Sequence, residues 1–289
     1  MKGIILAAGK GTRMYPASHS ISKTLLAIYD KPAIYYPLST LISAGIKEIM
    51  IITSKADRAA FKNLLGNGEQ FGISLKYAVQ KNRKGIADAL IIADRFIKND
   101  SVMLALGDNV FHGAEMSDLL AECVGYDGAA VFCTKVDNPS AFGIAEFDHN
   151  GRIISVEEKP TSPKSDMAIV GLYYYDKHAA EIAKSIHPSK RGELEITDVN
   201  RMYLERGTLR AMVMPESIYW ADTGTPDSIL AASEKIADIQ KSGVLTGSPE
   251  ATALHMGLIT PKQLLAWIQK MGNLSSNYYN TLYNLAKQS

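Results

Sequence analysis

Short apolar runs alternate with stretches of helical spacing through the first half of this 289-residue chain, and this alternation constrains the fold most. Nearly continuous apolar strands that alternate with helices are typical of a mostly parallel sheet with helices on both faces. We therefore expect an α/β fold. The predicted strands are Gly3–Ala8, Glu48–Thr53, Ser74–Val79, Val102–Leu106 and Ala129–Val136. The predicted helices are Ala33–Ala44, Asp57–Leu65, Ile86–Ile97 and Glu115–Val124.

The pattern changes near Phe142. A hairpin is predicted from Ala145–Asp148 to Ile153–Glu158, because Asn150 and Gly151 favour the positive φ of a tight turn. Later strands are predicted at Ala168–Tyr175, Leu209–Met214 and Ile218–Ala221, and later helices at Lys177–Ile186, Leu194–Arg206, Asp227–Gln240, Pro261–Lys270 and Ser275–Ala286. We expect residues 1–225 to form the main unit, divided at about residue 140, and the helical region 226–289 to pack on the same body.

Composition excludes several classes of protein. With 31 Lys+Arg against 30 Asp+Glu, the chain lacks the global positive field that would hold a nucleic acid or an anionic membrane. No segment approaches the roughly 18 consecutive apolar residues of a membrane helix, and the N-terminus runs into a strand without signal-peptide architecture. Cys123 and Cys133 lack metal-site spacing and are expected to be buried, reduced thiols of a cytoplasmic protein.

The first candidate site follows the first strand. Ligands of open α/β sheets collect at the carboxyl ends of the strands, which directs attention to the loop after Ala8. Gly9 and Gly11 let the backbone turn and approach a phosphate, while Lys10 and Arg13 oppose its charge. The spacing matches neither the Walker A loop nor the Rossmann glycine fingerprint.

Three further residues have two interpretations each. Lys23 is either a solvated surface lysine or a phosphate ligand whose loop folds over the strand ends. Asp108 follows a strand and either caps a turn or binds a divalent cation such as Mg²⁺. Asp222 is either a second ligand of that cation or, with Thr223, part of a helix N-cap.

A further group of charged residues, Glu158, Lys159 and Arg191, is suited to a sugar phosphate. Glu158 and Lys159 are adjacent on a predicted strand, so they should point to opposite faces unless the strand is bulged. The carboxylate suits sugar hydroxyls, and Lys159 together with Arg191 suits a second phosphate. Charge pairing at the surface remains the alternative for each.

Read in order, these segments resemble the sugar nucleotidylyltransferases, and among them most closely the glucose-1-phosphate thymidylyltransferases. The resemblance runs from Met1 to about Thr225 and more loosely to the end of the chain. Its segments are LAAGKGTRMYP, SKTLLAIYDKPAIYYPLSTL, LGDNVFHG, EEKP, GLYYYD, RGELEITD and WADTGT. It implies a Rossmann-like sheet and an enzyme that joins dTTP and glucose 1-phosphate into dTDP-glucose and pyrophosphate, for deoxysugar and cell-surface polysaccharide synthesis.

The resemblance also implies a role for each candidate. Arg13 and Lys23 would hold the nucleotide phosphates, Asp108 and Asp222 would hold Mg²⁺, and residues 1–140 would bind the nucleotide. The implied nucleotide contacts also include Leu6, Ala8, Gly9, Gly11, Thr12, Gln80 and Gly85, the last two reading the base. Residues 141–225 would bind the sugar phosphate through Gly143, Glu158, Lys159, Val170, Tyr173 and Arg191, with Trp220 beside the sugar or simply in the core.

Some positions depart from the family pattern. Ala8 stands where Gly is usual, Thr24 where Gln is usual, Ala27 where Pro is favoured and Phe142 where Tyr is usual. Ala8 and Thr24 leave the preference for the base open, and Phe142 leaves the preference for the sugar open. UTP or another hexose 1-phosphate is therefore the nearest alternative. A catalytically silent nucleotide-sugar sensor and a glycosyltransferase are the alternatives of other classes. The C-terminal region resembles the part of the family that forms contacts of a homotetramer and a second, regulatory nucleotide-sugar site, and the sequence leaves open whether this chain keeps that site.

Overall fold

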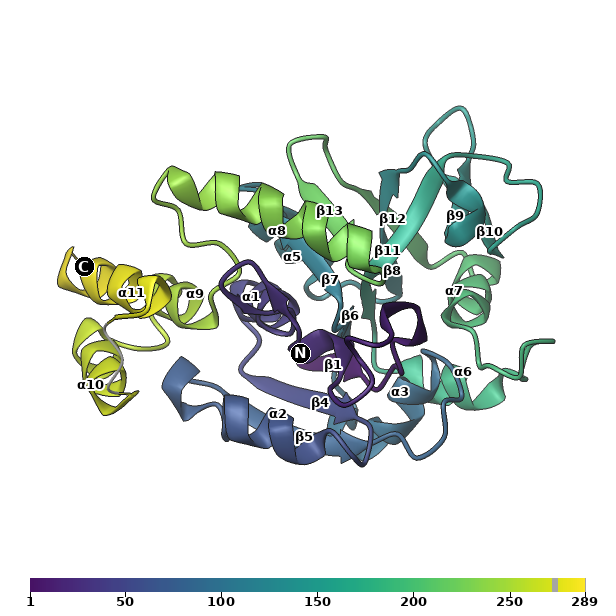
Figure 1. The fold of residues 1–289 in the computed structure, drawn as a ribbon. Coiled ribbons are helices and arrows are strands. Elements are labelled where there is room, and N and C mark those ends of the chain that lie inside the picture. The colour runs from purple at the N-terminus through teal and green to yellow at the C-terminus, as the bar shows by residue number, and fades with distance from the viewer. Residues whose placement is uncertain (272–274, 289) are drawn as a thin grey trace.

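The computed structural model describes residues 1–271 and 275–288, and a nine-stranded mixed sheet lies at its centre (Figure 1). The strand order is β10-β9-β11-β6-β1-β4-β5, with β8 pairing with β11 and with β12. The five strands predicted in the first half are confirmed, with ends that differ by at most one residue. They are β1 (Lys2–Ala7), β4 (Glu48–Thr53), β5 (Ser74–Val79), β6 (Val102–Leu106) and β8 (Ala129–Lys135). Neighbouring strands β6, β1, β4 and β5 are parallel, which confirms the predicted α/β fold.

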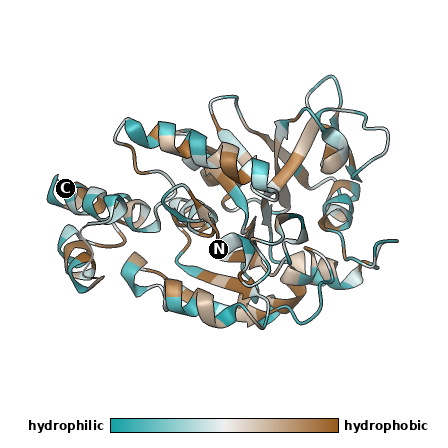
Figure 2. Cartoon of the chain, in the orientation of Figure 1, coloured by the Kyte–Doolittle hydropathy of each residue, from teal (hydrophilic) through white to brown (hydrophobic). Residues whose placement is uncertain are grey.

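The sheet is buried on both faces because successive side chains of each strand alternate. Ile4 and Leu104 belong to one buried cluster, whereas their neighbours Ile5 and Met103 belong to another on the opposite face. Figure 2 shows the apolar residues concentrated in these central strands and in the inward sides of the helices. This two-sided burial explains why the strands are recognisable as continuous apolar runs.

The helices of the first half lie close to their predicted positions, with one exception. The helix expected at Ile86–Ile97 is two short helices, α3 (Asp88–Ile92) and α4 (Asp94–Ile97), because the backbone of Ala93 (φ −85°, ψ 0°) leaves the α-helical range. The others are α1 (Tyr35–Ser43), α2 (Arg58–Leu65) and α5 (Met116–Cys123). Four single 3₁₀ turns are also described: η1 (Thr12–Met14), η2 (Lys23–Leu25), η3 (Glu69–Phe71) and η4 (Pro139–Ala141).

Most strands that the second half adds to the sheet are antiparallel to their neighbours, whereas β12 is parallel to β8. The predicted hairpin is confirmed as β9 (Gly143–Phe147) and β10 (Ile153–Glu158), and Gly151 has a positive φ of 75°. The other elements here are β11 (Met167–Tyr175), α6 (Ala179–Ser185), α7 (Ile196–Glu205), β12 (Leu209–Val213) and β13 (Tyr219–Asp222). Three short strands carry too little local pattern to have been predicted: β2 (Ala27–Ile28), β3 (Lys31–Pro32) and β7 (Asn109–His112).

The C-terminal helices pack on the same body. The buried residues Ala253, Leu264 and Leu282 belong to the cluster that covers one face of the sheet, and α1 contacts α9 (Figure 1). The buried residues Ala232 and Ile236 belong to a separate, smaller cluster. The helices are α8 (Pro226–Lys241), α9 (Pro249–His255), α10 (Pro261–Met271) and α11 (Asn277–Gln288); α9 was not predicted. The expected region 226–289 includes 272–274 and 289, which lie outside the described residues.

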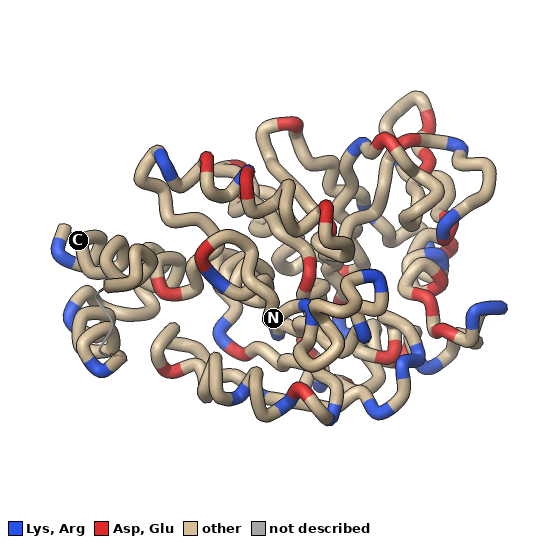
Figure 3. The backbone as a smooth tube through the Cα atoms, viewed as in Figure 1, with Lys and Arg blue, Asp and Glu red and all other residues tan. Residues whose placement is uncertain are grey.

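Burial, charge and helix length agree with the expectations from composition. Cys123 and Cys133 are both buried and unpaired. Lys, Arg, Asp and Glu are intermingled along the chain in Figure 3, in keeping with a net charge of +1. None of the described helices combines the length and the apolar character needed to cross a membrane.

Candidate active site

The site begins where the carboxyl ends of β1 and β6 lie side by side. Leu6 pairs with Leu106 in the parallel register, and the Gly107 N–H donates to the Leu6 carbonyl at 3.0 Å. The loop after β1 and the loop carrying Asp108 therefore leave the sheet at adjacent points. A Cβ on Gly107 would lie 3.0 Å from Thr24 Cγ2, so a glycine allows this close approach.

The glycine loop packs directly on Lys23. A Cβ on Gly11, whose φ is +63°, would lie 2.9 Å from Lys23 Cβ, and one on Gly9 would lie 3.6 Å from Lys23 Cε. The ammonium group of Lys23 forms an ion pair with the Asp108 carboxylate, 85 residues further along the chain. Lys23 is thus folded over the strand ends, and its interpretation as a solvated surface lysine is wrong.

Asp222 is brought beside Asp108 by the pairing of β13 with β7, in which Asp222 lies opposite Asn109. The backbone N–H and the hydroxyl of Thr223 both donate to the Asp108 carbonyl, at 2.9 and 2.7 Å. The N-cap of α8 is Thr225, whose hydroxyl accepts from Ser228 N–H. The interpretation of Asp222 and Thr223 as the helix cap is therefore wrong.

Burial raises the pKa of Asp222 to about 6, and the negative charge of Asp108 adds to this effect. Lys23, Arg13 and Lys159 act in the opposite direction because their positive charges favour the ionised carboxylate. Arg13 lies against the turn that follows Asp222: a Cβ on Gly224 would be 2.5 Å from Arg13 Nη2. Two carboxylates and three cations from distant segments thus share one electrostatic site.

This donor set fits a small divalent cation. Two carboxylates that repel one another in a buried position gain from a shared positive charge, and Mg²⁺ commonly takes one or two protein carboxylates together with phosphate oxygens. Within residues 1–271 and 275–288, no cluster of three or more His, Cys, Asp or Glu offers a cation site made of protein alone. Substrate oxygens would have to complete the coordination.

A cavity of about 570 Å³ opens beside these residues. It brings together seven of the residues predicted for the site: Arg13, Asp108, Gly143, Glu158, Lys159, Tyr173 and Asp222. The strand β10 ends at Glu158, and Lys159 has a left-handed φ of 42°. In a regular strand Glu158 and Lys159 would point to opposite faces. Because the backbone turns at Lys159, both side chains line the same cavity.

Two of the predicted sugar-phosphate residues do not line this cavity. Val170 is buried in the core on the other face of β11, while its neighbours Ile169 and Gly171 face the cavity. Arg191 lies at the rim, half-exposed, with Nη1 3.5 Å from Glu158 Oε1 and Nη2 3.0 Å from Glu193 Oε2.

The structure adds Asn109, a residue that was not predicted. Asn109 is buried, and its Oδ1 accepts from the Trp220 indole N–H at 2.7 Å and from Gly171 N–H at 3.1 Å. Its Nδ2 lies 3.3 Å from Asp108 Oδ1, so one amide links a wall of the cavity to the carboxylate pair. Trp220 lines the cavity and packs edge-on against Phe142, 5.5 Å between ring centroids. A buried Asn after Gly-Asp carries no sequence signal that separates it from a turn residue.

The residues predicted to read a base lie at the edge of the sheet where the glycine loop begins. Gln80 follows β5 at the same edge of the sheet, and its amide donates to the Gly85 carbonyl at 3.1 Å. Arg83 reaches back to the Ala8 carbonyl, with its Nε 3.4 Å away. A Cβ on Gly85, which has a φ of +96°, would overlap the carbonyl oxygen of Leu194.

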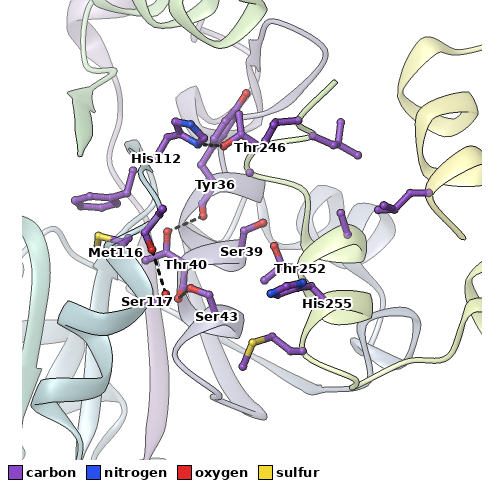
Figure 4. Close-up of a pocket in the computed structure, with 18 of the residues that line it drawn as sticks. Tyr36, Ser39, Thr40, Ser43, His112, Met116, Ser117, Thr246, Thr252 and His255 are labelled. Carbon is purple, nitrogen blue, oxygen red and sulfur yellow. Dashed lines mark hydrogen bonds between the residues drawn. The ribbon is translucent and has the colours of Figure 1, made fainter. Parts of the chain in front are cut away.

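A second, larger cavity of about 880 Å³ lies away from these groups, between α1, β7, the loop 243–247 and the helices α9 and α11 (Figure 4). Its polar lining consists of hydroxyl, amide and imidazole groups, and His112 Nδ1 lies 2.6 Å from Thr246 Oγ1. Lys, Arg, Asp and Glu are absent from the described residues that line it. It therefore lacks the charges that phosphate chemistry requires.

Comparison with known proteins agrees with this geometry. Residues 2–239 match the family of nucleotidyl transferases. The chain is 52% identical over 241 residues (83% of this chain, 84% of the relative) to a glucose-1-phosphate thymidylyltransferase of Neisseria meningitidis. It is 47% identical over 286 residues, 99% of both chains, to one of Mycolicibacterium smegmatis. A Bacillus anthracis structure provisionally named as the same enzyme, in complex with sucrose, matches with a TM-score of 0.78 and 39% identity, covering 86% of this chain and 98% of that one.

Proposed function

The chain belongs to the nucleotidyl transferase family, and from that premise we propose that it is a glucose-1-phosphate thymidylyltransferase that makes dTDP-glucose and pyrophosphate from dTTP and glucose 1-phosphate. The observation that carries the proposal is the convergence of Arg13, Lys23, Asp108 and Asp222 beside the cavity that also receives Lys159 and Glu158. These are the charges that two phosphorylated substrates require.

Arg13 and Lys23 bind and orient the triphosphate. An oxygen of the sugar phosphate attacks the α-phosphorus, the bond to the β-phosphate oxygen breaks, and pyrophosphate leaves. Negative charge grows on the α-phosphate oxygens and on the leaving group, and fixed cations stabilise it most when they are already in place. Lys23 pairs with Asp108 before substrate binds and exchanges this partner for phosphate, while Arg13 is seated against Gly224.

Asp108 and Asp222 would hold Mg²⁺, which when bound neutralises charge on the phosphate oxygens. For this role both carboxyl groups must be ionised. Since burial and the charge of Asp108 raise the pKa of Asp222 to about 6, activity should decline as the pH falls below that value. Asn109 keeps one Asp108 oxygen oriented, with Nδ2 3.3 Å away.

Lys159 and Arg191 neutralise the sugar phosphate, so that one anion can approach the other. Glu158 accepts hydrogen bonds from sugar hydroxyls, and Thr197 Oγ1 holds its other oxygen at 2.6 Å. Gly143, Tyr173 and the backbone near Val170 complete the sugar-facing wall in this proposal. Two cations thus hold the phosphate while hydrogen-bonding groups hold the sugar ring, which favours a hexose 1-phosphate over a free hexose.

The base lies against Gln80 and the backbone of Gly85, with the glycine loop from Leu6 through Thr12 around the nucleotide. A glutamine amide reads the edges of thymine and uracil alike, so UTP is the second candidate donor. Ala8 adds a methyl group next to this part of the site.

The proposal is tested by measuring pyrophosphate release with Mg²⁺ for dTTP, UTP, dCTP and ATP against several hexose 1-phosphates. We expect the highest kcat/KM with dTTP and glucose 1-phosphate, and a loss of at least about a hundredfold in Asp108→Asn. The exposed Asp137→Asn is the matched control and should retain activity. Binding of dTDP-glucose without turnover of any pair would instead identify a silent nucleotide-sugar sensor.

We also propose a homotetramer in which the C-terminal region 226–289 forms subunit contacts, with the cavity of Figure 4 as the place for a regulatory ligand. Exposed apolar side chains in this region, Leu230, Val244 and Met271, support a contact surface. Two unpaired, buried thiols support a reducing compartment such as the cytoplasm. Light scattering after size exclusion tests the assembly, and a monomer would contradict it.

A further inference from the structure

We propose that Asp88 is a positioning residue that fixes the amide of Gln80 in one orientation, and that this orientation makes the base site select a ring N–H and reject cytosine. The inference rests on the proposed function, because it places a nucleoside triphosphate against Gln80. It concerns a residue that the mechanism above does not use.

The orientation of Gln80 follows from the chemistry of its two partners. Gln80 is 7% exposed, and its amide lies 3.1 Å from the Gly85 carbonyl oxygen and 2.9 Å from Asp88 Oδ2. A carbonyl and a carboxylate only accept hydrogen bonds. The amide atom that faces both must therefore be Nε2, whose two hydrogens are used by these two acceptors.

The opposite amide atom, Oε1, is consequently turned away from Gly85 and Asp88. Among the described residues, none donates a hydrogen bond to it. Thymine and uracil carry a ring N3–H that Oε1 can accept, whereas cytosine carries an N3 lone pair that would face a second lone pair. A buried site discriminates strongly against a base that leaves such groups unpaired, because a buried polar group without a hydrogen bond has lost its water and gained nothing in return.

The backbone segment that carries both partners of the amide is held in place. The Gly85 backbone is packed against Leu194, whose carbonyl oxygen accepts from Ala87 N–H at 3.2 Å. The Leu194 N–H in turn donates to the Lys84 carbonyl at 2.5 Å. Asp88 begins helix α3 directly after this pinned segment. Rotating the Gln80 amide would place Oε1 against the Gly85 carbonyl oxygen and the Asp88 carboxylate, neither of which can donate a hydrogen bond to it.

The carboxylate contributes the larger share of this restraint, since hydrogen bonds to charged acceptors are roughly twice as strong as those between neutral groups. Without Asp88, only the Gly85 carbonyl opposes the rotated amide. With Nε2 turned outward, Gln80 would donate to the cytosine N3 lone pair. Removing Asp88 should therefore admit cytosine more than it harms thymine.

The test compares kcat/KM for dTTP, dUTP and dCTP, with glucose 1-phosphate and Mg²⁺, in wild type, Asp88→Ala and Asp88→Asn. We expect the dTTP-to-dCTP ratio to fall about tenfold in Asp88→Ala, and the dTTP-to-dUTP ratio to stay unchanged. Asp88→Asn should restore most of the discrimination, because its Oδ1 still accepts from Nε2. Asp94→Ala is the control, since Asp94 begins the neighbouring helix α4 and pairs with Lys184 on the surface.

An unchanged dTTP-to-dCTP ratio in Asp88→Ala, or an equal fall of kcat/KM for both nucleotides, would overturn the proposal and leave Asp88 a structural role only. If Asp88→Ala does not fold, Gln80→Met takes its place and should lower the rate with dTTP without lowering that with dCTP. If the wild type turns over no nucleotide, the proposed function fails by itself. The ratio of calorimetric dissociation constants for dTTP and dCTP then tests the inference separately.

Discussion

Replacing Asp222 by Asn should stabilise the metal-free protein while abolishing its activity. Asp222 is buried beside Asp108, so the folded state disfavours its negative charge. The amide of Asn keeps the shape of the side chain but removes that charge. The structure therefore predicts that the residue proposed to bind the cation lowers the stability of the fold, as is common where activity and stability conflict.

The magnitude follows from the pKa of this carboxyl, which is raised from 3.8 to about 6, first by burial and then by Asp108. A raised pKa means that folding favours the protonated form. The stabilisation is thus fully present below pH 3.8 and is lost as the pH rises through about 6. Two pKa units correspond to about 3 kcal/mol. Roughly 1 kcal/mol is already lost at about pH 4.5, so Asp222→Asn should gain about 2 kcal/mol more at about pH 8 than at about pH 4.5.

Urea unfolding in EDTA, followed by circular dichroism at the two pH values, measures this difference. The exposed Asp137→Asn is the control and should show no such dependence on pH. Adding Mg²⁺ should raise the unfolding midpoint of the wild type but not that of Asp222→Asn, because a bound ligand stabilises only the form that binds it. An equal gain at both pH values, or a loss of stability at the higher one, would refute the electrostatic reasoning.

Three other perturbations are informative. In Gly224→Ala the new Cβ would lie 2.5 Å from Arg13 Nη2 and displace that flexible side chain. We therefore expect kcat to fall about ten- to a hundredfold while the unfolding free energy changes by less than about 1 kcal/mol. A normal kcat would exclude a role for the Arg13 guanidinium in its position against Gly224. Lys23→Met keeps the aliphatic chain that packs on the glycine loop but removes the positive charge beside Asp108. We expect kcat to fall about a hundredfold and the acidic limb of the kcat/KM profile to move to higher pH. An unmoved limb would count against an effect of the Lys23 charge on the pKa of Asp222. Burial raises the pKa of each cysteine thiol to about 12. Neither thiol should therefore react with a disulfide reagent near neutral pH until urea unfolds the chain, and fast labelling of the native protein would contradict this.

The sheet and part of the site could be predicted from the sequence because their signals are local. The strands β4, β5 and β6 have the predicted bounds. A central strand buried on both faces, such as β6, must be apolar at nearly every position, whereas the edge strand β5 alternates exposed Ser74 and Lys76 with apolar residues. Each strand end also identifies the loop that follows it, and this is enough to select Arg13 and Asp108 as candidates. The split of the predicted helix at Ala93 shows where local periodicity fails to define the hydrogen-bonding pattern.

Only the tertiary structure decided how the candidates combine. Lys23 and Asp108 pair across 85 residues, and Asp222 joins them through the pairing of β13 with β7. The strand β7 was not predicted from the sequence. Such contacts depend on strand order and on backbone turns like that at Lys159, which no local pattern encodes. The orientation of the Gln80 amide likewise depends on acceptors that folding places around it. Residue types define which chemistry the chain can perform, and long-range packing determines which of those groups share a site.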